Sequence, residues 1–194
     1  MSTDTSRKTY RLVISALLLA VGFVLPFITG NIQAIAKVIS PLHIPALICG
    51  LCCGPAWGAV LGAVMPVLRG LIVGIPVFPT SALPMAFELA AYGFFTGVFY
   101  QALLKKRLWK SHLPAMMISL VCAMVLGRFV GGAAKALMLA VGVIGSKSPF
   151  TFAAFFTSYF VSTAVGALIH LILVPAVVLA LEKAKLSPMT GDLR

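Results

Sequence analysis

The chain has 194 residues, of which 61% are hydrophobic and only 10% are charged. A soluble domain keeps roughly a quarter of its residues charged, so the composition excludes an ordinary soluble domain and indicates an integral membrane protein. The formal net charge is +11, with 15 lysines and arginines against four acids. These basic residues lie mainly at the ends of apolar segments, where they orient a protein in a bilayer, so the charge does not indicate nucleic-acid binding.

The first predicted element is a membrane helix over about residues 11–28. Arg7, Lys8 and Arg11 precede the apolar run Leu12–Phe27, an arrangement typical of a helix whose N-terminal end is cytoplasmic. A signal peptide is the alternative, but its apolar region is usually only roughly 7–15 residues long. We therefore expect a retained first helix.

The next apolar block, 44–77, is too long to be a single membrane helix. As one helix it would measure about 50 Å, against a hydrocarbon core of about 30 Å. Gly54 and Pro55 interrupt it, in the order that ends one helix and begins another. We predict a hairpin of two helices, over about 43–53 and 56–74, whose first arm is too short to span the core unaided.

Three further membrane helices are predicted over about 83–104, 113–142 and 152–182. The basic stretch 105–110 is expected in the cytoplasm, like the N-terminus, so an even number of crossings must separate the two. The hairpin must then cross twice. The sequence therefore predicts an all-α integral membrane protein with six transmembrane helices in a single domain, 1–194. Both termini would be cytoplasmic, and the protein would be multi-pass in a prokaryotic plasma membrane.

Four charged side chains fall inside the predicted helices: Arg69, Glu88, Arg128 and Lys135. A charge there costs roughly 2.5–3.5 kcal/mol on insertion scales, so each needs a partner or a function. Arg128 and Lys135 are nearly two turns apart and share a helix face. We predict that all four converge, with His43 at the outer mouth, on an outward-opening substrate pocket between the third, fourth and fifth helices.

A purely structural role is the alternative for these charges. Glu88 would pair with Arg69 or Arg128, and Lys135 would extend towards the interface. One carboxylate cannot neutralise three cations, however, and the surplus suits a ligand that carries a carboxylate or several acceptors. Glu88 can equally accept from N–H groups of a heterocycle. His170, on the last helix, is interpreted as a core histidine.

Small residues recur at helix-packing spacing. Glycines occur every fourth residue in the hairpin, at Gly50, Gly54, Gly58 and Gly62. This spacing lets helices approach closely in lipid, and we interpret it as packing within the chain. A second group, Gly127, Gly131 and Gly132, leaves space for a ligand or a close helix. Ala16 and Ala20 form a third pair, on the first helix, which we predict to be a docking surface for another membrane subunit.

Motifs for catalysis are missing from the sequence. There is no G-x-x-x-x-G-K-[ST] loop for ATP, and no H-E-x-x-H or G-x-S-x-G motif. Cys49-x-x-Cys52 lacks the second pair of a metal site, so the cysteines are interpreted as packing residues. We predict no catalytic residue, no metal and no cofactor, and therefore no enzyme.

The chain resembles the substrate-binding S components of energy-coupling factor (ECF) vitamin transporters over about residues 10–183. The resemblance rests on the six helices, on Ala16-x-x-x-Ala20 and on the glycine–proline break of the hairpin. Three stretches carry it further, namely Pro41-Leu-His-Ile-Pro-Ala-Leu-Ile-Cys-Gly-Leu-Cys-Cys-Gly-Pro55, Met65-Pro-Val-Leu-Arg69 and Met85-Ala-Phe-Glu-Leu-Ala-Ala-Tyr-Gly93. These motifs are most similar to a branch regulated with queuosine metabolism.

The resemblance implies the substrate-capture subunit of an ABC-type importer. It would bind a vitamin or related micronutrient from outside, a queuosine precursor in that branch, whereas the excess of cations favours an anionic vitamin. Its implied partners are a transmembrane T component, docked on Ala16 and Ala20, and two cytoplasmic ATPases that drive toppling and release. The alternative is a stand-alone proton-coupled small-molecule transporter that uses Glu88. Dependence of uptake on the ATPases or on the proton gradient separates the two.

Overall fold

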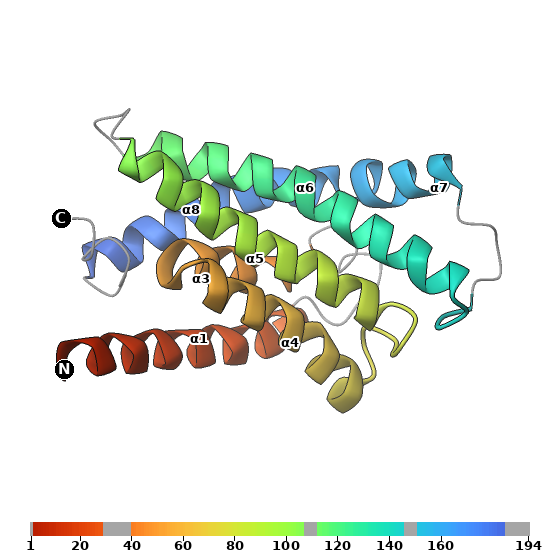
Figure 1. Cartoon of the computed structure of the whole chain (residues 1–194), viewed down its shortest axis with the longest axis horizontal. Helices are drawn as coiled ribbons and strands as arrows, with labels where there is room; N and C mark the ends of the chain where they lie inside the picture. The colour runs from red at the N-terminus through yellow and green to blue at the C-terminus, as the bar shows by residue number, and fades with distance from the viewer. Residues whose placement is uncertain (1, 29–39, 107–111, 146–150, 185–194) are drawn as a thin grey trace.

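The computed structural model describes residues 2–28, 40–106, 112–145 and 151–184, and its regular elements there are all helices (Figure 1). They are α1 (Ser2–Ile28), α3 (His43–Cys53), α4 (Pro55–Val73), α5 (Ala82–Lys105), α6 (His112–Ala140), α7 (Phe152–Phe156), the π-helical turn η1 (Thr157–Val161) and α8 (Ala164–Lys183). Within the described ranges, five segments are long and apolar enough to cross a membrane, and α3 is a shorter apolar helix. The predicted all-α, multi-pass class is confirmed, while the sixth crossing stays a prediction.

Two helices differ clearly from their predicted bounds. α1 begins at Ser2 rather than near residue 11, because the polar stretch before the apolar run contains no glycine or proline to stop a helix. The last segment, predicted as one helix over 152–182, is interrupted between α7 and α8. Its serine and threonine hydroxyls compete for backbone carbonyls, which weakens the regular helix at that point.

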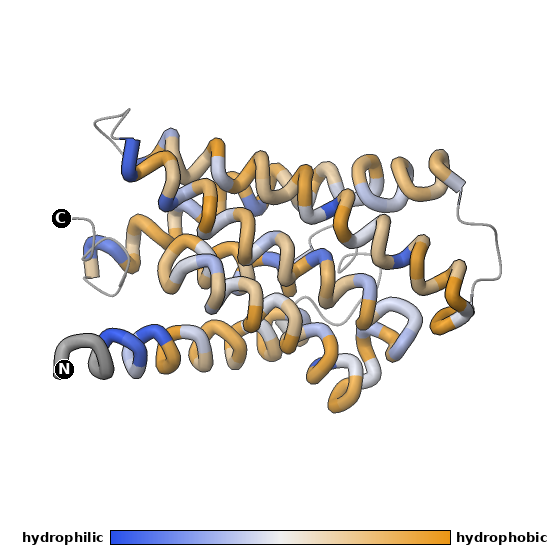
Figure 2. Tube along the Cα trace, in the orientation of Figure 1, coloured by the Kyte–Doolittle hydropathy of each residue, from blue (hydrophilic) through white to orange (hydrophobic). Residues whose placement is uncertain are grey.

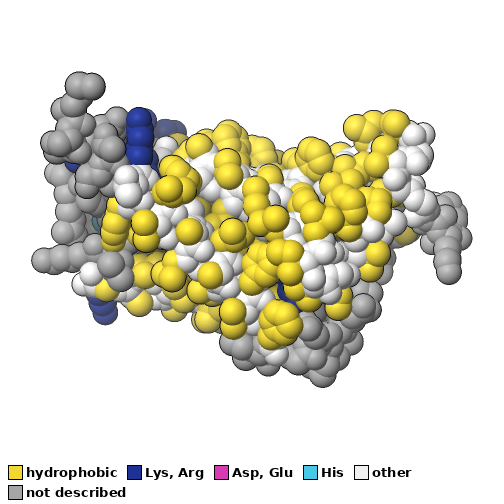
Figure 3. All heavy atoms as spheres, turned by 90° about the horizontal axis from the view of Figure 1, so that it is seen from below, with side chains coloured by type: hydrophobic (Ala, Val, Ile, Leu, Met, Phe, Trp, Pro, Cys, Tyr) yellow, Lys and Arg dark blue, Asp and Glu magenta, His cyan; other side chains and the backbone are white. Residues whose placement is uncertain are grey.

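The helices run back and forth, so that the basic residues of three helices gather at one end. Figure 2 shows hydrophilic residues where α1 begins, where α5 ends and where α8 ends, all at the same end of the bundle. Figure 3 shows a face covered by hydrophobic side chains, with lysines and arginines mainly at that end. α3 returns towards this end and α4 leaves it again (Figure 1). This arrangement supports the argument that an even number of crossings separates the N-terminus from the basic stretch after α5. Several basic residues lie outside the described residues, namely Lys37, Arg107, Lys110, Lys147, Lys185 and Arg194.

Glycine contacts hold α3, α4 and α5 together. A Cβ on Gly62 would overlap the backbone of Leu89, and one on Gly93 would overlap the carbonyl of Gly58. Gly54, between α3 and α4, has a φ of 100°, a conformation that favours glycine and turns the chain sharply. The interpretation of the hairpin glycines as packing within the chain is confirmed. The three cysteines of α3 are likewise buried, as expected of packing residues.

Candidate functional site

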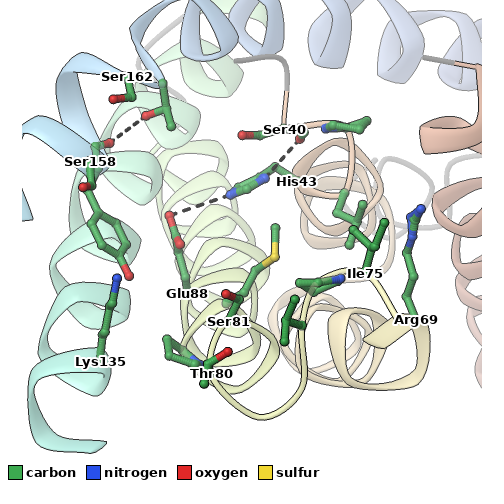
Figure 4. Close-up of a pocket in the computed structure, with 18 of the residues that line it drawn as sticks. Ser40, His43, Arg69, Ile75, Thr80, Ser81, Glu88, Lys135, Ser158 and Ser162 are labelled. Carbon is green, nitrogen blue, oxygen red and sulfur yellow. Dashed lines mark hydrogen bonds and ion pairs between the residues drawn. The ribbon is translucent and has the colours of Figure 1, made fainter. Parts of the chain in front are cut away.

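A cavity of about 590 Å³ lies beside the start of α3. This volume is within the usual range for a small-molecule site. Its walls come from the end of α1, the start of α3, the end of α4, the α4–α5 loop, the first turns of α5, the later turns of α6 and the interrupted last helix. Figure 4 labels ten of the lining residues, namely Ser40, His43, Arg69, Ile75, Thr80, Ser81, Glu88, Lys135, Ser158 and Ser162.

Helix ends bring these walls together. α3 begins at His43 and has only 11 residues, about half the length needed to cross a bilayer core, so its first turn lies inside the bundle. α4 ends at Val73 and is capped by Gly74, whose φ of 78° and N–H bond to the carbonyl of Gly70 form a left-handed cap. The loop that follows, 75–81, folds back over the cavity before α5 starts.

Glu88 is held in a polar contact network at the centre of the cavity (Figure 4). The Tyr92 hydroxyl donates to Glu88 Oε1 at 2.8 Å. His43 Nδ1 donates to the carbonyl of Ser40 at 3.0 Å, which leaves Nε2 facing Glu88 Oε1 at 3.7 Å. The Glu88 side chain is 12% exposed, so it is a largely desolvated, oriented acceptor. Such a group favours a ligand that donates N–H or O–H bonds.

The glycines of α6 make room for this network. A Cβ on Gly127 would overlap the ring of Tyr92, and one on Gly131 would lie 2.7 Å from Cβ of Glu88. Gly132 lies against the ring of Phe155 in the same way. The space that the sequence analysis assigned to a ligand or a close helix is therefore filled by side chains of α5 and α7.

Three of the four predicted charges share the cavity. Arg69, Glu88 and Lys135 line it together with His43. Arg69 is nevertheless almost wholly buried, at 1% exposed, and its guanidinium carbon lies 5.5 Å from the centroid of the Phe27 ring. These four residues come from four different helices, so the predicted convergence is present for them.

Arg128 is not among the described residues that line the cavity. Its Nη2 donates to the carbonyl of Thr163 at 3.5 Å, and its guanidinium carbon lies 5.4 Å from the centroid of the Phe160 ring. Arg128 shares a helix face with Lys135, but seven residues place it about 10 Å deeper along α6. At that depth α6 packs against the interrupted last helix and against Tyr92 of α5. Direct contact of Arg128 with a ligand stays a prediction.

Other residues at or beside the cavity carry weaker sequence signals. His170 is buried and stacks on His43 with 5.7 Å between ring centroids, in agreement with its interpretation as a core histidine. Tyr92 was missed, although it follows Glu88 by four residues and so shares its helix face. Ser158 and Ser162 were also missed; their four-residue spacing in an apolar helix was the available signal.

Tyr92→Phe is expected to lower stability by about 1–2 kcal/mol, because it removes a buried hydrogen bond to a carboxylate. Thermal unfolding in detergent measures the change. Tyr100→Phe is the matched control, since the Tyr100 hydroxyl makes a longer contact of 3.5 Å to Glu182, away from the cavity. Equal losses in the two variants would contradict a special role for the Tyr92–Glu88 bond.

One comparison with known proteins finds a match. A family model described as "ECF transporter, substrate-specific component" matches residues 10–181. Neither the search of curated proteins nor that of solved structures found a match. The matched range contains every residue named above as lining the cavity, and also Ala16 and Ala20.

Proposed function

The chain belongs to the ECF transporter substrate-specific components, and from this premise we propose that it captures a vitamin or related micronutrient from outside the cell for import. Members of this family are substrate-binding subunits and not enzymes. The observation that carries the proposal is the cavity that brings His43, Arg69, Glu88 and Lys135 together. The α4–α5 loop lines this cavity, and Figure 1 shows that loop at the end of the bundle opposite the one where the basic residues gather.

The cavity offers two kinds of recognition. Glu88 accepts hydrogen bonds from N–H groups, while Arg69 and Lys135 donate to carbonyl or carboxylate oxygens. Because Arg128 does not line the cavity, two cations and one carboxylate line it, which is a smaller excess of cations than the sequence suggested. A heterocycle of the queuosine-precursor type, with N–H donors beside acceptors, satisfies both kinds of group. An anionic vitamin is the competing class.

The proposed assembly places the protein in the cell membrane of a prokaryote. It crosses six times, with α3 and α4 as two of the crossings and both termini in the cytoplasm. A transmembrane T component docks on Ala16 and Ala20, and two cytoplasmic ATPases supply the energy for toppling and release. Both alanines are exposed on α1, and α1 lies at the edge of the bundle (Figure 1), which supports this docking face.

Native mass spectrometry of the protein, extracted gently from its own membranes, tests the proposal. We expect a retained metabolite of a few hundred daltons, together with a T component and ATPase subunits in the mildest detergent. The mass and fragmentation of the metabolite then separate a heterocyclic precursor from an anionic vitamin. A chain that carries neither a metabolite nor partners would contradict the proposed function.

Glu88→Gln is expected to weaken retention of this metabolite by at least about fivefold, because the loss of a charge-assisted hydrogen bond costs roughly 1–3 kcal/mol. The fraction of protein that carries the metabolite in native spectra measures the change. Glu182→Gln is the control, because Glu182 contacts Tyr100 near the end of α8. If both variants retain the metabolite like the wild type, Glu88 has a structural role only.

A proton-coupled carrier is the second candidate, and the contacts of Glu88 with Tyr92 and His43 are the observation that favours it. A membrane carboxylate of this kind is a possible proton site. Uptake in cells lacking the ATPase subunits decides between the two. If cells without the ATPase subunits lose uptake while the proton gradient is intact, the result supports the importer. If these cells keep uptake and only a protonophore abolishes it, the result supports the carrier.

A further inference from the structure

The last membrane segment is interrupted where it passes the cavity. Between α7 and α8, the amide of Ser162 donates to the carbonyl of Thr157, five residues back, at 2.9 Å. The hydroxyl of Thr163 donates to the carbonyl of Tyr159 at 2.6 Å. Inside a membrane, such irregular backbone is tolerated only where protein groups or a water-filled cavity satisfy it. We call Thr157–Thr163 the interrupted segment.

Arg128 of α6 contacts the interrupted segment twice. Its Nη2 donates to the carbonyl of Thr163 at 3.5 Å, the same carbonyl that accepts the amide of Ala167 in the first turn of α8 at 2.9 Å. Its guanidinium also lies over the ring of Phe160. The hydrogen bond is long, but the stacking on Phe160 adds to it. Arg128 is only 9% exposed, and besides these contacts its guanidinium interacts with the Tyr92 hydroxyl of α5.

The interrupted segment also faces the cavity. Ser158, Tyr159, Ser162 and Thr163 line it, and Figure 4 shows Ser158 and Ser162 across the cavity from His43. The Tyr159 hydroxyl donates to the carbonyl of Gly131 at 3.4 Å. This wall carries hydroxyl and carbonyl groups, whereas the charged groups of the cavity come from other helices.

We propose that Arg128 is a positioning residue, which holds the interrupted segment in place as a wall of uncharged hydrogen-bonding groups. The hydroxyls of Tyr159, Ser162 and Thr163 already donate to backbone carbonyls, so their oxygens remain as acceptors. This wall therefore takes a neutral, hydrogen-bond-donating part of the ligand, such as a hydroxyl, while Glu88 and Lys135 take its N–H and acceptor groups. The inference rests on the proposed function for the ligand, but the positioning by Arg128 does not depend on it.

Hydrogen exchange of the full chain in detergent, read by mass spectrometry, tests the positioning. In Arg128→Met we expect exchange of the Ser162 and Ala167 amides to rise about tenfold, since a bond from a charged donor is lost. Arg128→Lys keeps the charge but not the planar group over Phe160, so we expect an intermediate rise. Val165→Ala is the control, because Val165 lies just after the interrupted segment, in the first turn of α8, and is 56% exposed.

The same preparations test the ligand wall. The double change Ser158→Ala and Ser162→Ala is expected to reduce the retained metabolite at least fivefold and to leave exchange in α8 unchanged. Unchanged retention would overturn the wall as a recognition surface. Loss of the metabolite in Arg128→Met without faster exchange would overturn positioning and make Arg128 a direct contact.

Two further outcomes separate the inference from the proposed function. Faster exchange throughout α3, α4 and α5 in Arg128→Met would overturn the local role, because Arg128 would then stabilise the whole bundle. A wild-type chain that carries no metabolite would contradict the proposed function, and it would also contradict the ligand part of the inference. The exchange result would still decide whether Arg128 positions the interrupted segment.

Discussion

Gly93→Leu is expected to leave little or no folded protein. Gly93 is buried on α5 where this helix meets both arms of the hairpin. A Cβ there would overlap the carbonyl of Gly58 and lie 2.8 Å from its Cα, and the carbonyl of Gly93 is itself in the way of a Cβ on Gly50. These neighbours are backbone atoms, which cannot turn aside as a flexible side chain can.

The expected cost follows from this geometry. Extra carbon atoms in a packed core usually cost about 1–3 kcal/mol, and more where helices must separate. A loss beyond about 3 kcal/mol removes a large part of the roughly 5–15 kcal/mol that stabilises a typical protein. Size-exclusion chromatography and thermal unfolding in detergent measure the outcome. Gly145→Leu is the control, because a Cβ at Gly145 meets nothing within 4 Å; equal behaviour of the two variants would contradict the packing.

Ala16→Trp and Ala20→Trp are each expected to abolish uptake while leaving the metabolite bound. Both alanines are exposed on α1, whose inward face is formed by Ser15, Leu18 and Gly22. Small residues at four-residue spacing allow close approach of another membrane helix, and a tryptophan would keep the T component from that distance. The cavity, which these alanines do not line, would remain intact.

Uptake in cells and metabolite retention in native spectra measure the two effects separately. Ile172→Trp is the control, because Ile172 on α8 is 75% exposed and lies outside the proposed docking face. Normal uptake in both alanine variants would show that α1 is not the docking surface. If these variants also lose the bound metabolite, the tryptophan disturbs the fold of the protein and not only its docking to the T component.

Local properties of the sequence determined the class of the protein and most helix bounds. Hydrophobic runs and their basic ends specify membrane helices without any knowledge of neighbours, because each helix satisfies its own backbone in lipid. The break at Gly54 was equally predictable, since a glycine followed by proline ends one helix and begins the next. Glu88 also stood out alone, as the one carboxylate within the apolar part of the chain.

Contacts between helices decided the rest. Arg128 and Lys135 look equivalent on one helix face, but only Lys135 reaches the cavity, because the interrupted segment meets α6 at the depth of Arg128. Gly127 and Gly131 indicated space for a ligand or a close helix, and the structure decides for the helix, because side chains of α5 fill that space. A pattern along one chain specifies which face of a helix is polar or small; the identity of the group opposite that face depends on the register and depth of another helix, which only the tertiary structure determines.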